Sequence, residues 1–145
     1  MNDRFKFRAW IKAENRMATV KSIDLFSCFV SASGGAVETL SKGDNCVVYR
    51  DESEIELMQC TGLKDSTETL IYEGDILKHK WCCGYDQYLE TISVVKWCDK
   101  TAMFICDDTK RSDFPTSLHI NAPKGDLKIV GNIYEIPNYT GGRVE

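Results

Sequence analysis

The chain has 145 residues, 43% of them hydrophobic, and a formal net charge of −4. This length fits one domain, or two small lobes that share a core, and it suffices for folding without disulfides or a structural metal. An acidic chain disfavours general binding to a phosphate backbone, because that function needs an excess of lysine and arginine on one surface. The sequence shows no apolar run near ~20 residues and no signal-peptide features, so we expect a cytoplasmic protein that does not enter a membrane.

Alternating apolar and charged residues begin the chain, in RFKFRAWI (4–11). A period of two predicts a strand with Phe5 and Phe7 directed toward the core. The opposite face would carry Arg4, Lys6, Arg8 and Trp10. A second strand, MATVKSIDLF (17–26), follows a polar turn and completes a hairpin. We expect the basic first strand to lie at a sheet edge, where a neighbouring chain can pair with it.

Charge is distributed unevenly along the chain. Residues 1–21 carry six bases and two acids, whereas residues 38–75 carry ten acids and three bases. The two regions are therefore expected to attract each other, either within one monomer or between subunits.

The middle of the chain alternates between loop signals and short strand patterns. A glycine-containing loop precedes CVVYR (46–50), which predicts a strand, and a short helical turn at AVETL (36–40) is an option within that loop. ESEIELMQC (52–60) contains helix formers, but its alternation favours a strand. TLIYEGDILKHKW (69–81) predicts two strand pieces that are separated at Glu73-Gly74-Asp75.

The Glu73-Gly74-Asp75 step predicts a structural corner rather than a catalytic carboxylate. Glycine permits a positive φ, and an aspartate directly after it can accept hydrogen bonds from backbone amides. A catalytic carboxylate would want a second acid, a base or a metal ligand at a defined spacing, and the nearby sequence offers none.

ETISVVKWCDKTAMFICDD (90–108) is the clearest hairpin. With Lys100 and Thr101 as a two-residue turn, Trp97 faces Phe104 across the strands. We predict that this face is buried, because it holds both aromatic side chains. Its members are Val95, Trp97, Phe104 and Cys106, and the opposite face holds Lys96, Cys98, Met103 and Ile105.

The last third of the chain returns to strand after a long loop. Pro115 and Pro123 mark the loop, and LKIVGNIYEIP (127–137) predicts a final strand with a kink at Gly131. Residues 138–145 have the composition of a frayed tail. Many short strands separated by turns are typical of a small barrel or of two packed sheets.

Five short segments occur in order along the chain. They are KFRAW with the following NRM (6–17), ELMQCTGLKD (56–65), IYEGDILK (71–78), VVKWCDKTAMF (94–104) and IVGNIYEIP (129–137). Together they resemble the YopX family of small phage and prophage proteins. Two turn positions depart from the family pattern: Ile11 stands where an acid usually follows the tryptophan, and Ser66-Thr67-Glu68-Thr69 replaces an Asn-Gly turn.

The resemblance implies a mainly β fold (α+β with little helix). An N-terminal β-rich lobe (1–62) would precede an SH3-like small β-barrel (63–137) and a flexible tail (138–145). It also implies a phage or prophage origin and a setting in the cytoplasm of the host cell. The family brings no known activity, so no catalytic residue is transferred.

Cysteines and histidines offer few arrangements with chemical meaning. The seven cysteines contain no CxxC spacing, which favours reduced thiols that act as small hydrophobic side chains over a metal site built from distant strands. Cys82 or Cys83 with His119 is the nearest candidate for a nucleophile pair. Neither His119 nor His79 has metal-ligand spacing, and neighbouring Asp107-Asp108 is more typical of a solvated loop than of a cation site. With no nucleotide-binding motif present, we expect no catalytic residues, no metal and no cofactor.

Aromatic residues beside bases are the remaining candidates for a binding site. Strand faces of this kind bind single-stranded nucleic acid or peptides, although a solvated face with a partly buried tryptophan is the simpler interpretation. The two sets are Trp10 with Arg4, Lys6 and Arg8, and Trp81 with Lys78 and Lys80. We expect an accessory protein that is not an enzyme and that binds a protein partner or itself as a homo-oligomer. Nucleic-acid binding is the alternative, and a thiol- or metal-dependent enzyme is a more distant one.

Overall fold

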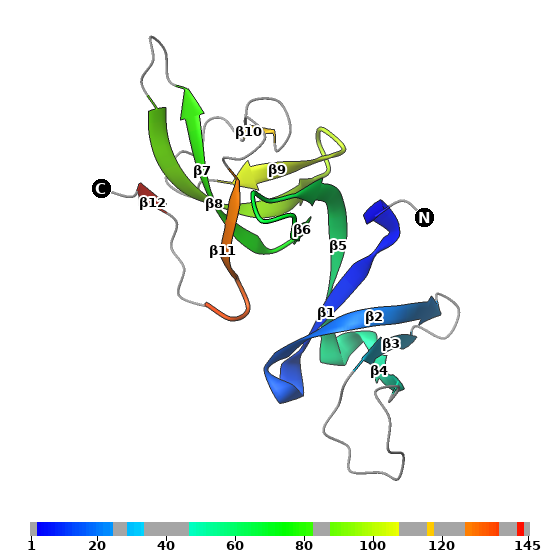
Figure 1. The fold of residues 1–145 in the computed structure, drawn as a ribbon. Helices are drawn as coiled ribbons and strands as arrows, with labels where there is room; N and C mark the ends of the chain where they lie inside the picture. Colours follow the sequence, from blue (N-terminus) through cyan, green and yellow to red (C-terminus); the bar gives the residue numbers. More distant parts are fainter. Residues whose placement is uncertain are drawn as a thin grey trace. The chain divides into compact units, whose positions relative to one another are not determined.

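A computed structural model describes residues 3–24, 29–33, 47–82, 88–107, 116–117, 127–136 and 142–143. These ranges form two antiparallel sheets with almost no helix, which confirms the mainly β fold class (Figure 1). Their helical residues are confined to three short 3-10 helices, η1 (Asp3–Phe5), η2 (Lys12–Glu14) and η3 (Glu52–Glu54). None of the helices in this part of the chain is long and apolar enough to cross a membrane.

The chain divides into two compact units, Met1–Gln59 and Cys60–Glu145. The first sheet has the strand order β4-β3-β2-β1-β5-β6. Its strands are β1 (Phe7–Ile11), β2 (Arg16–Asp24), β3 (Phe29–Ser33), β4 (Val47–Asp51), β5 (Ile55–Lys64) and β6 (Leu70–Tyr72). The unit boundary lies within β5, a few residues before the boundary predicted after residue 62. The first half of this strand pairs with β1 and the second half with β6.

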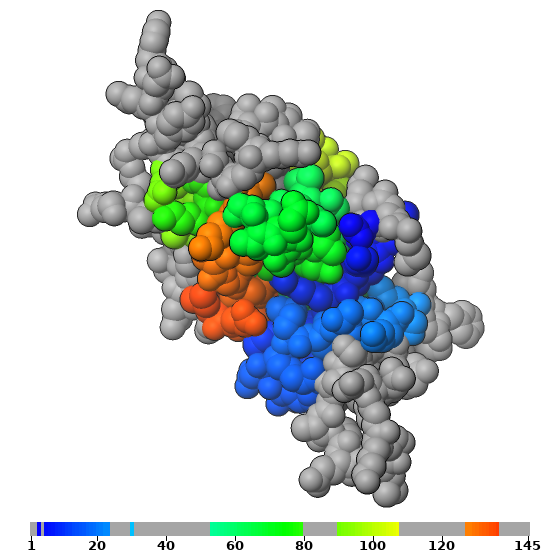
Figure 2. Space-filling view, in the orientation of Figure 1, coloured from blue at the N-terminus to red at the C-terminus, as the bar shows by residue number. Residues whose placement is uncertain are grey.

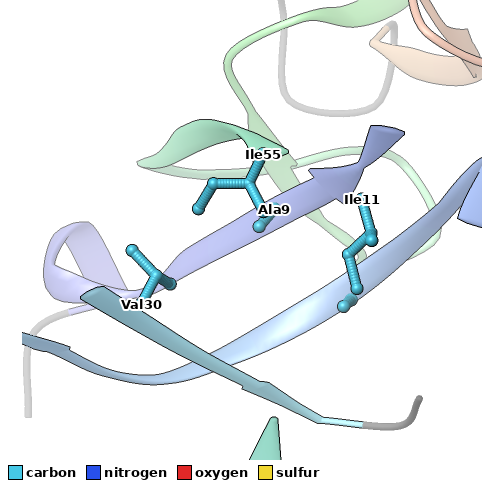
Figure 3. Close-up of a cluster of buried hydrophobic side chains, with 5 residues drawn as sticks. Ala9, Ile11, Val30 and Ile55 are labelled. Atoms are coloured by element: carbon cyan, nitrogen blue, oxygen red, sulfur yellow. The ribbon is translucent and has the colours of Figure 1, made fainter. Parts of the chain in front are cut away.

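A cluster of small and branched apolar side chains forms the core of the first unit (Figure 3). Its members are Ala9, Ile11, Ala18, Val30 and Ile55, with Val20 and Ile23 packed against them. The alternation in the sequence directs Ala9 and Ile11 to one face of β1, where they meet their cross-strand neighbours.

Two predictions for the first strand are wrong. The strand begins at Phe7, because η1 occupies Asp3–Phe5 and leaves the Phe5 side chain 68% exposed rather than in the core. β1 is also not a sheet edge. It lies between β2 and β5, so that Ala9 pairs with Ala18 on one side and with Leu57 on the other. Both edges of β1 are therefore occupied by strands of the same chain.

The basic and acidic regions meet within one chain. Lys12, from the basic region, forms an ion pair with Glu56 at 2.9 Å. Its Nζ also donates a hydrogen bond to the backbone oxygen of Ser53 at 3.0 Å. Of the two arrangements that the charge distribution allows, the structure shows the intramolecular one.

The second sheet has the order β10-β9-β8-β7-β11. Its strands are β7 (Asp75–Cys82), β8 (Tyr88–Cys98), β9 (Met103–Asp107), β10 (Thr116–Ser117) and β11 (Lys128–Asn132), with β12 (Gly142–Arg143) paired to β8. β9 ends opposite Val94, so its described residues do not pair with the earlier residues of β8. Gly142 and Arg143 pair there with Ile92 and Thr91, in place of the fully frayed tail that the sequence predicts.

An apolar cluster in the second unit gathers side chains from strands that are distant in sequence. Its buried members are Ile71, Leu77, Val95, Phe104 and Cys106, and Leu63, Leu127 and Ile129 pack against them. The final strand is shorter than predicted, since β11 ends at Asn132 and residues 133–136 form turns. Its pairing with β7 shifts register between Ile129 and Gly131, where the sequence predicts a kink.

The register predicted for the β8–β9 hairpin is confirmed, with Trp97 opposite Phe104 and Val95 opposite Cys106. Val95, Phe104 and Cys106 are buried. The predicted burial of Trp97 is wrong, because its side chain is 41% exposed. Trp97 lies two residue pairs nearer to the turn than Val95, and of the Trp97–Phe104 pair only Phe104 belongs to the core cluster.

Candidate functional site

The corner between β6 and β7 is built around Gly74. Its φ is +78°, the left-handed backbone that the sequence predicts for this glycine. The Gly74 amide donates to the Val95 carbonyl at 2.8 Å, and its own carbonyl accepts from the Ile133 amide at 3.0 Å. A Cβ atom at position 74 would lie 3.3 Å from Nδ2 of Asn132. Three segments that are distant in sequence therefore meet at this glycine.

Asp75 anchors the same corner with both of its carboxylate oxygens. Its side chain is 1% exposed. Oδ2 accepts the Tyr72 amide at 2.8 Å, and Oδ1 lies 3.4 Å from Nδ2 of Asn132. Oδ1 of Asn132 in turn accepts the Tyr134 amide at 3.0 Å. A buried carboxylate with these partners orders the backbone, and it is not presented to a ligand.

A second aspartate, Asp65, organises the turn between β5 and β6. Its Oδ1 accepts the amides of Thr67 and Thr69 at 2.8 and 3.0 Å and the Thr67 hydroxyl at 2.7 Å. Oδ2 accepts the Ile129 amide at 3.2 Å, and the Ser66 amide donates to the Leu127 carbonyl at 2.8 Å. Figure 2 shows β11 (orange) beside this part of the chain (green). The turn thus covers the start of β11 and occupies edge groups that a foreign strand would otherwise pair with.

Hydrogen bonding sets the ionisation of Asp65. Burial by itself raises the pKa of this carboxyl, but the bonds from the Thr67 hydroxyl and from the Thr69, Ile129 and Thr67 amides outweigh it and hold the pKa below its ordinary value. A lowered folded-state pKa stabilises the fold above the pKa of the unfolded chain, and this contribution is lost as pH falls through the folded-state pKa.

We expect Asp65→Asn to lower the free energy of unfolding by about 1–3 kcal/mol at neutral pH, because an amide nitrogen cannot accept the Ile129 amide. The difference from wild type should shrink as the pH falls below ~4, because the Asp65 carboxyl of the unfolded wild-type chain then binds a proton more readily than that of the folded chain. Urea denaturation at pH 7 and pH 3 measures both quantities. A gap of equal size at the two pH values would contradict the role given to the ionised carboxylate.

A buried polar row crosses the second sheet, from His79 through Ser93 to Cys106. His79 Nε2 and Ser93 Oγ are 2.9 Å apart, and Ser93 also bonds the Cys106 thiol. Burial raises the pKa of Cys106 to about 11, although the bond with Ser93 acts in the opposite direction. The thiol is therefore protonated at neutral pH and is a weak nucleophile.

The nucleophile pair considered from sequence, Cys82 or Cys83 with His119, falls outside the described side chains. The described ranges contain no group of three or more potential metal ligands, and among their side chains Cys60, Cys98 and Cys106 are reduced cysteines.

The aromatic-basic candidates are divided between the two units. Arg4, Lys6, Arg8 and Trp10 belong to the first unit, and Lys78, Lys80 and Trp81 to the second. Trp10 is 8% exposed and Arg8 is partly buried. Lys6 pairs with Asp3 at 2.8 Å, and Lys78 pairs with Glu90 at 2.8 Å. Arg4 lies in η1, and Lys80 and Trp81 in β7, but their side chains fall outside the described part of the structure.

The turn of the β8–β9 hairpin presents a different aromatic surface. We call it the hairpin tip and define it as Trp97, Asp99, Lys100 and Phe104. The Trp97 ring meets the Phe104 ring edge-on, with centroids 5.1 Å apart and an interplanar angle of 73°. Asp99 and Lys100 are both exposed and form the centre of a turn that the Thr101 amide closes onto the Cys98 carbonyl at 3.3 Å.

The turn that carries the hairpin tip is longer than predicted. It comprises Asp99–Ala102, since Cys98 and Met103 form the last pair, and Ala102 has φ +50°. Lys96, which precedes Trp97, pairs with Asp107 at 2.6 Å. Sequence reasoning missed this surface because it assigned Trp97 to the core, although the position of Trp97 next to the turn is a signal for exposure.

The fold and this surface define a mainly β protein of two antiparallel sheets that exposes an aromatic hairpin. A family model described as YopX protein matches residues 6–139, and the chain belongs to the YopX family. The chain is also similar to protein EF1440 from Enterococcus faecalis, known from a crystal structure. The TM-score is 0.57 and the identity 24%, over 93% of this chain and 96% of that one, which is a likeness of fold. A search of curated proteins gave no match.

Proposed function

We propose that this chain is a phage or prophage accessory protein that works in the cytoplasm by binding a protein chain, and that it is not an enzyme. The observation that carries the proposal is the exposed Trp97 ring, 41% accessible at the hairpin tip. Tryptophan is enriched among the residues that dominate protein–protein binding energy. Because the Phe104 ring supports it from one side, little side-chain freedom remains to be lost when a partner binds.

The ion pairs of the structure favour a protein partner over nucleic acid. Phosphate binding needs bases whose charge is available to the ligand. Lys6, Lys78 and Lys96 each have an acidic partner within 2.8 Å, and the whole chain is acidic. The pairs of Lys6 and Lys78 reduce the positive field at the two aromatic-basic sets that the nucleic-acid alternative would use.

Three of the described groups with catalytic chemistry have structural surroundings. The carboxylates of Asp65 and Asp75 accept backbone amides, and the Cys106 thiol is buried with a raised pKa. Nucleophiles and general bases act when they can reach a substrate and when their pKa values suit the reaction. This arrangement supports a binding role over a thiol-dependent enzyme.

Substituting Trp97 tests the proposal. In affinity capture from infected or prophage-carrying cells, Trp97→Ala should weaken retention of the bound protein at least tenfold, as expected for a residue that dominates binding. Phe5→Ala is the matched control, since Phe5 is also a large exposed side chain, 68% accessible, in the other unit. Thermal melting checks that both variants are folded at the temperature of the assay.

Equal losses for the two variants would indicate nonspecific adhesion of exposed aromatic side chains and would contradict the proposal. Unchanged binding by Trp97→Ala would contradict it as well. Association with single-stranded DNA or RNA that weakens steeply with salt and survives Trp97→Ala would instead support the nucleic-acid alternative.

A further inference from the structure

We infer that the partner of the hairpin tip is a second copy of this chain, docked tip to tip about a two-fold axis. The inference rests on the proposed function and names the partner for the same surface. It also moves self-association from β1 to the hairpin tip. The sequence predicted edge pairing at β1, but β1 is flanked by β2 and β5.

A two-fold contact requires a patch that is complementary to itself, since each copy contributes the same residues. Asp99 and Lys100 satisfy this requirement. They are adjacent, exposed and opposite in charge at the centre of the turn. When two tips meet in antiparallel orientation, Lys100 of each copy faces Asp99 of the other, and two ion pairs form. Lys96 does not add an uncompensated charge to the patch, because Asp107 neutralises it at 2.6 Å.

The Trp97 ring supplies the apolar part of the contact. Docking about the two-fold axis removes both exposed rings from water, and the area withdrawn is the main source of affinity. The ammonium group of Lys100 from the second copy can also lie over the face of the Trp97 ring, where the ring quadrupole attracts it. A second copy offers an apolar ring to Trp97 and an opposite charge to both Asp99 and Lys100. A partner of uniform charge would repel one of these two side chains.

A patch of this size makes a weak dimer. Interfaces that bury less than about 1,200 Å² are typical of transient association. We therefore expect a monomer–dimer equilibrium that depends on protein concentration, and charge reversal at the tip should displace it.

Charge-swap variants test the inference by sedimentation equilibrium over a range of concentrations. Asp99→Lys makes both charges of the tip positive, and Lys100→Asp makes both negative. Each variant alone should dimerise at least tenfold more weakly than wild type, because like charges then face each other. An equimolar mixture of the two variants should form the mixed dimer with an affinity close to that of wild type. The double variant Asp99→Lys/Lys100→Asp should also recover dimerisation.

Several outcomes would overturn the inference. One is single variants that dimerise as wild type does, and another is a mixture no tighter than either variant alone. A third is a wild-type chain that stays monomeric throughout, while Trp97→Ala still releases a different captured protein. That last result leaves the proposed function standing with another partner. If Trp97→Ala still self-associates and still captures its partner as wild type does, the proposed function itself is contradicted.

Discussion

Replacing Phe104 with alanine should lower the free energy of unfolding by about 3–5 kcal/mol, the usual cost of emptying a buried aromatic site. Phe104 is 8% exposed and belongs to the core cluster with Leu77 and Val95. Its ring also carries the edge contact with Trp97, and such contacts add about 0.5–1.5 kcal/mol beyond burial.

Chemical denaturation measures this change through the transition midpoint and slope. Phe5→Ala is the control, because an exposed site should change stability by no more than about 0.5 kcal/mol. A cost below about 1 kcal/mol for Phe104→Ala would show that the β8–β9 face is not part of the core.

Gly74→Val should destabilise the protein by more than ~2 kcal/mol, because a β-branched residue at φ +78° adds steric strain to the usual cost of left-handed backbone. The new Cβ would also press on Nδ2 of Asn132 at 3.3 Å and on Cγ1 of Ile133 at 3.4 Å. The loss should appear as a lower denaturation midpoint, with the bonds that join β7 to the segment after β11 weakened first.

Gly74→Asn is the matched variant for this site, because asparagine adopts left-handed backbone more readily than valine. It should cost clearly less than Gly74→Val, although it adds the same Cβ. Equal costs would assign the effect to crowding against Asn132 and Ile133 alone, and a neutral Gly74→Val would contradict the structural role of the corner.

Local patterns in the sequence were sufficient for much of the fold. The register of the β8–β9 hairpin followed from a turn between β-branched and aromatic residues, because alternation with a period of two can be recognised without knowing any distant strand. The glycine-aspartate step at 74–75 was similarly informative. Glycine readily adopts left-handed backbone, and an aspartate side chain readily accepts hydrogen bonds from nearby backbone amides. Exposure was harder to predict. Trp97 has the chemistry of a core residue, and its exposure depends on where the core ends along the hairpin.

Features that join distant segments could not be predicted from one sequence. The His79–Ser93 contact depends on how β7 pairs with β8, and the sequence between these strands gave no signal for that register. The interior position of β1 likewise depends on β5, which lies more than forty residues later in the chain. A period-two pattern reports which face of a strand is buried, but it does not report which strands lie beside it.

The central claim, that the hairpin tip is a binding surface, is tested most directly by oxidative footprinting of Trp97 with mass spectrometry. The account predicts that the Trp97 ring reacts readily in dilute protein and is protected on self-association or in a captured complex. The Phe5 ring, 68% exposed in the other unit, should react equally in both states. A Trp97 ring that stays equally reactive at every concentration and in every complex would contradict the account.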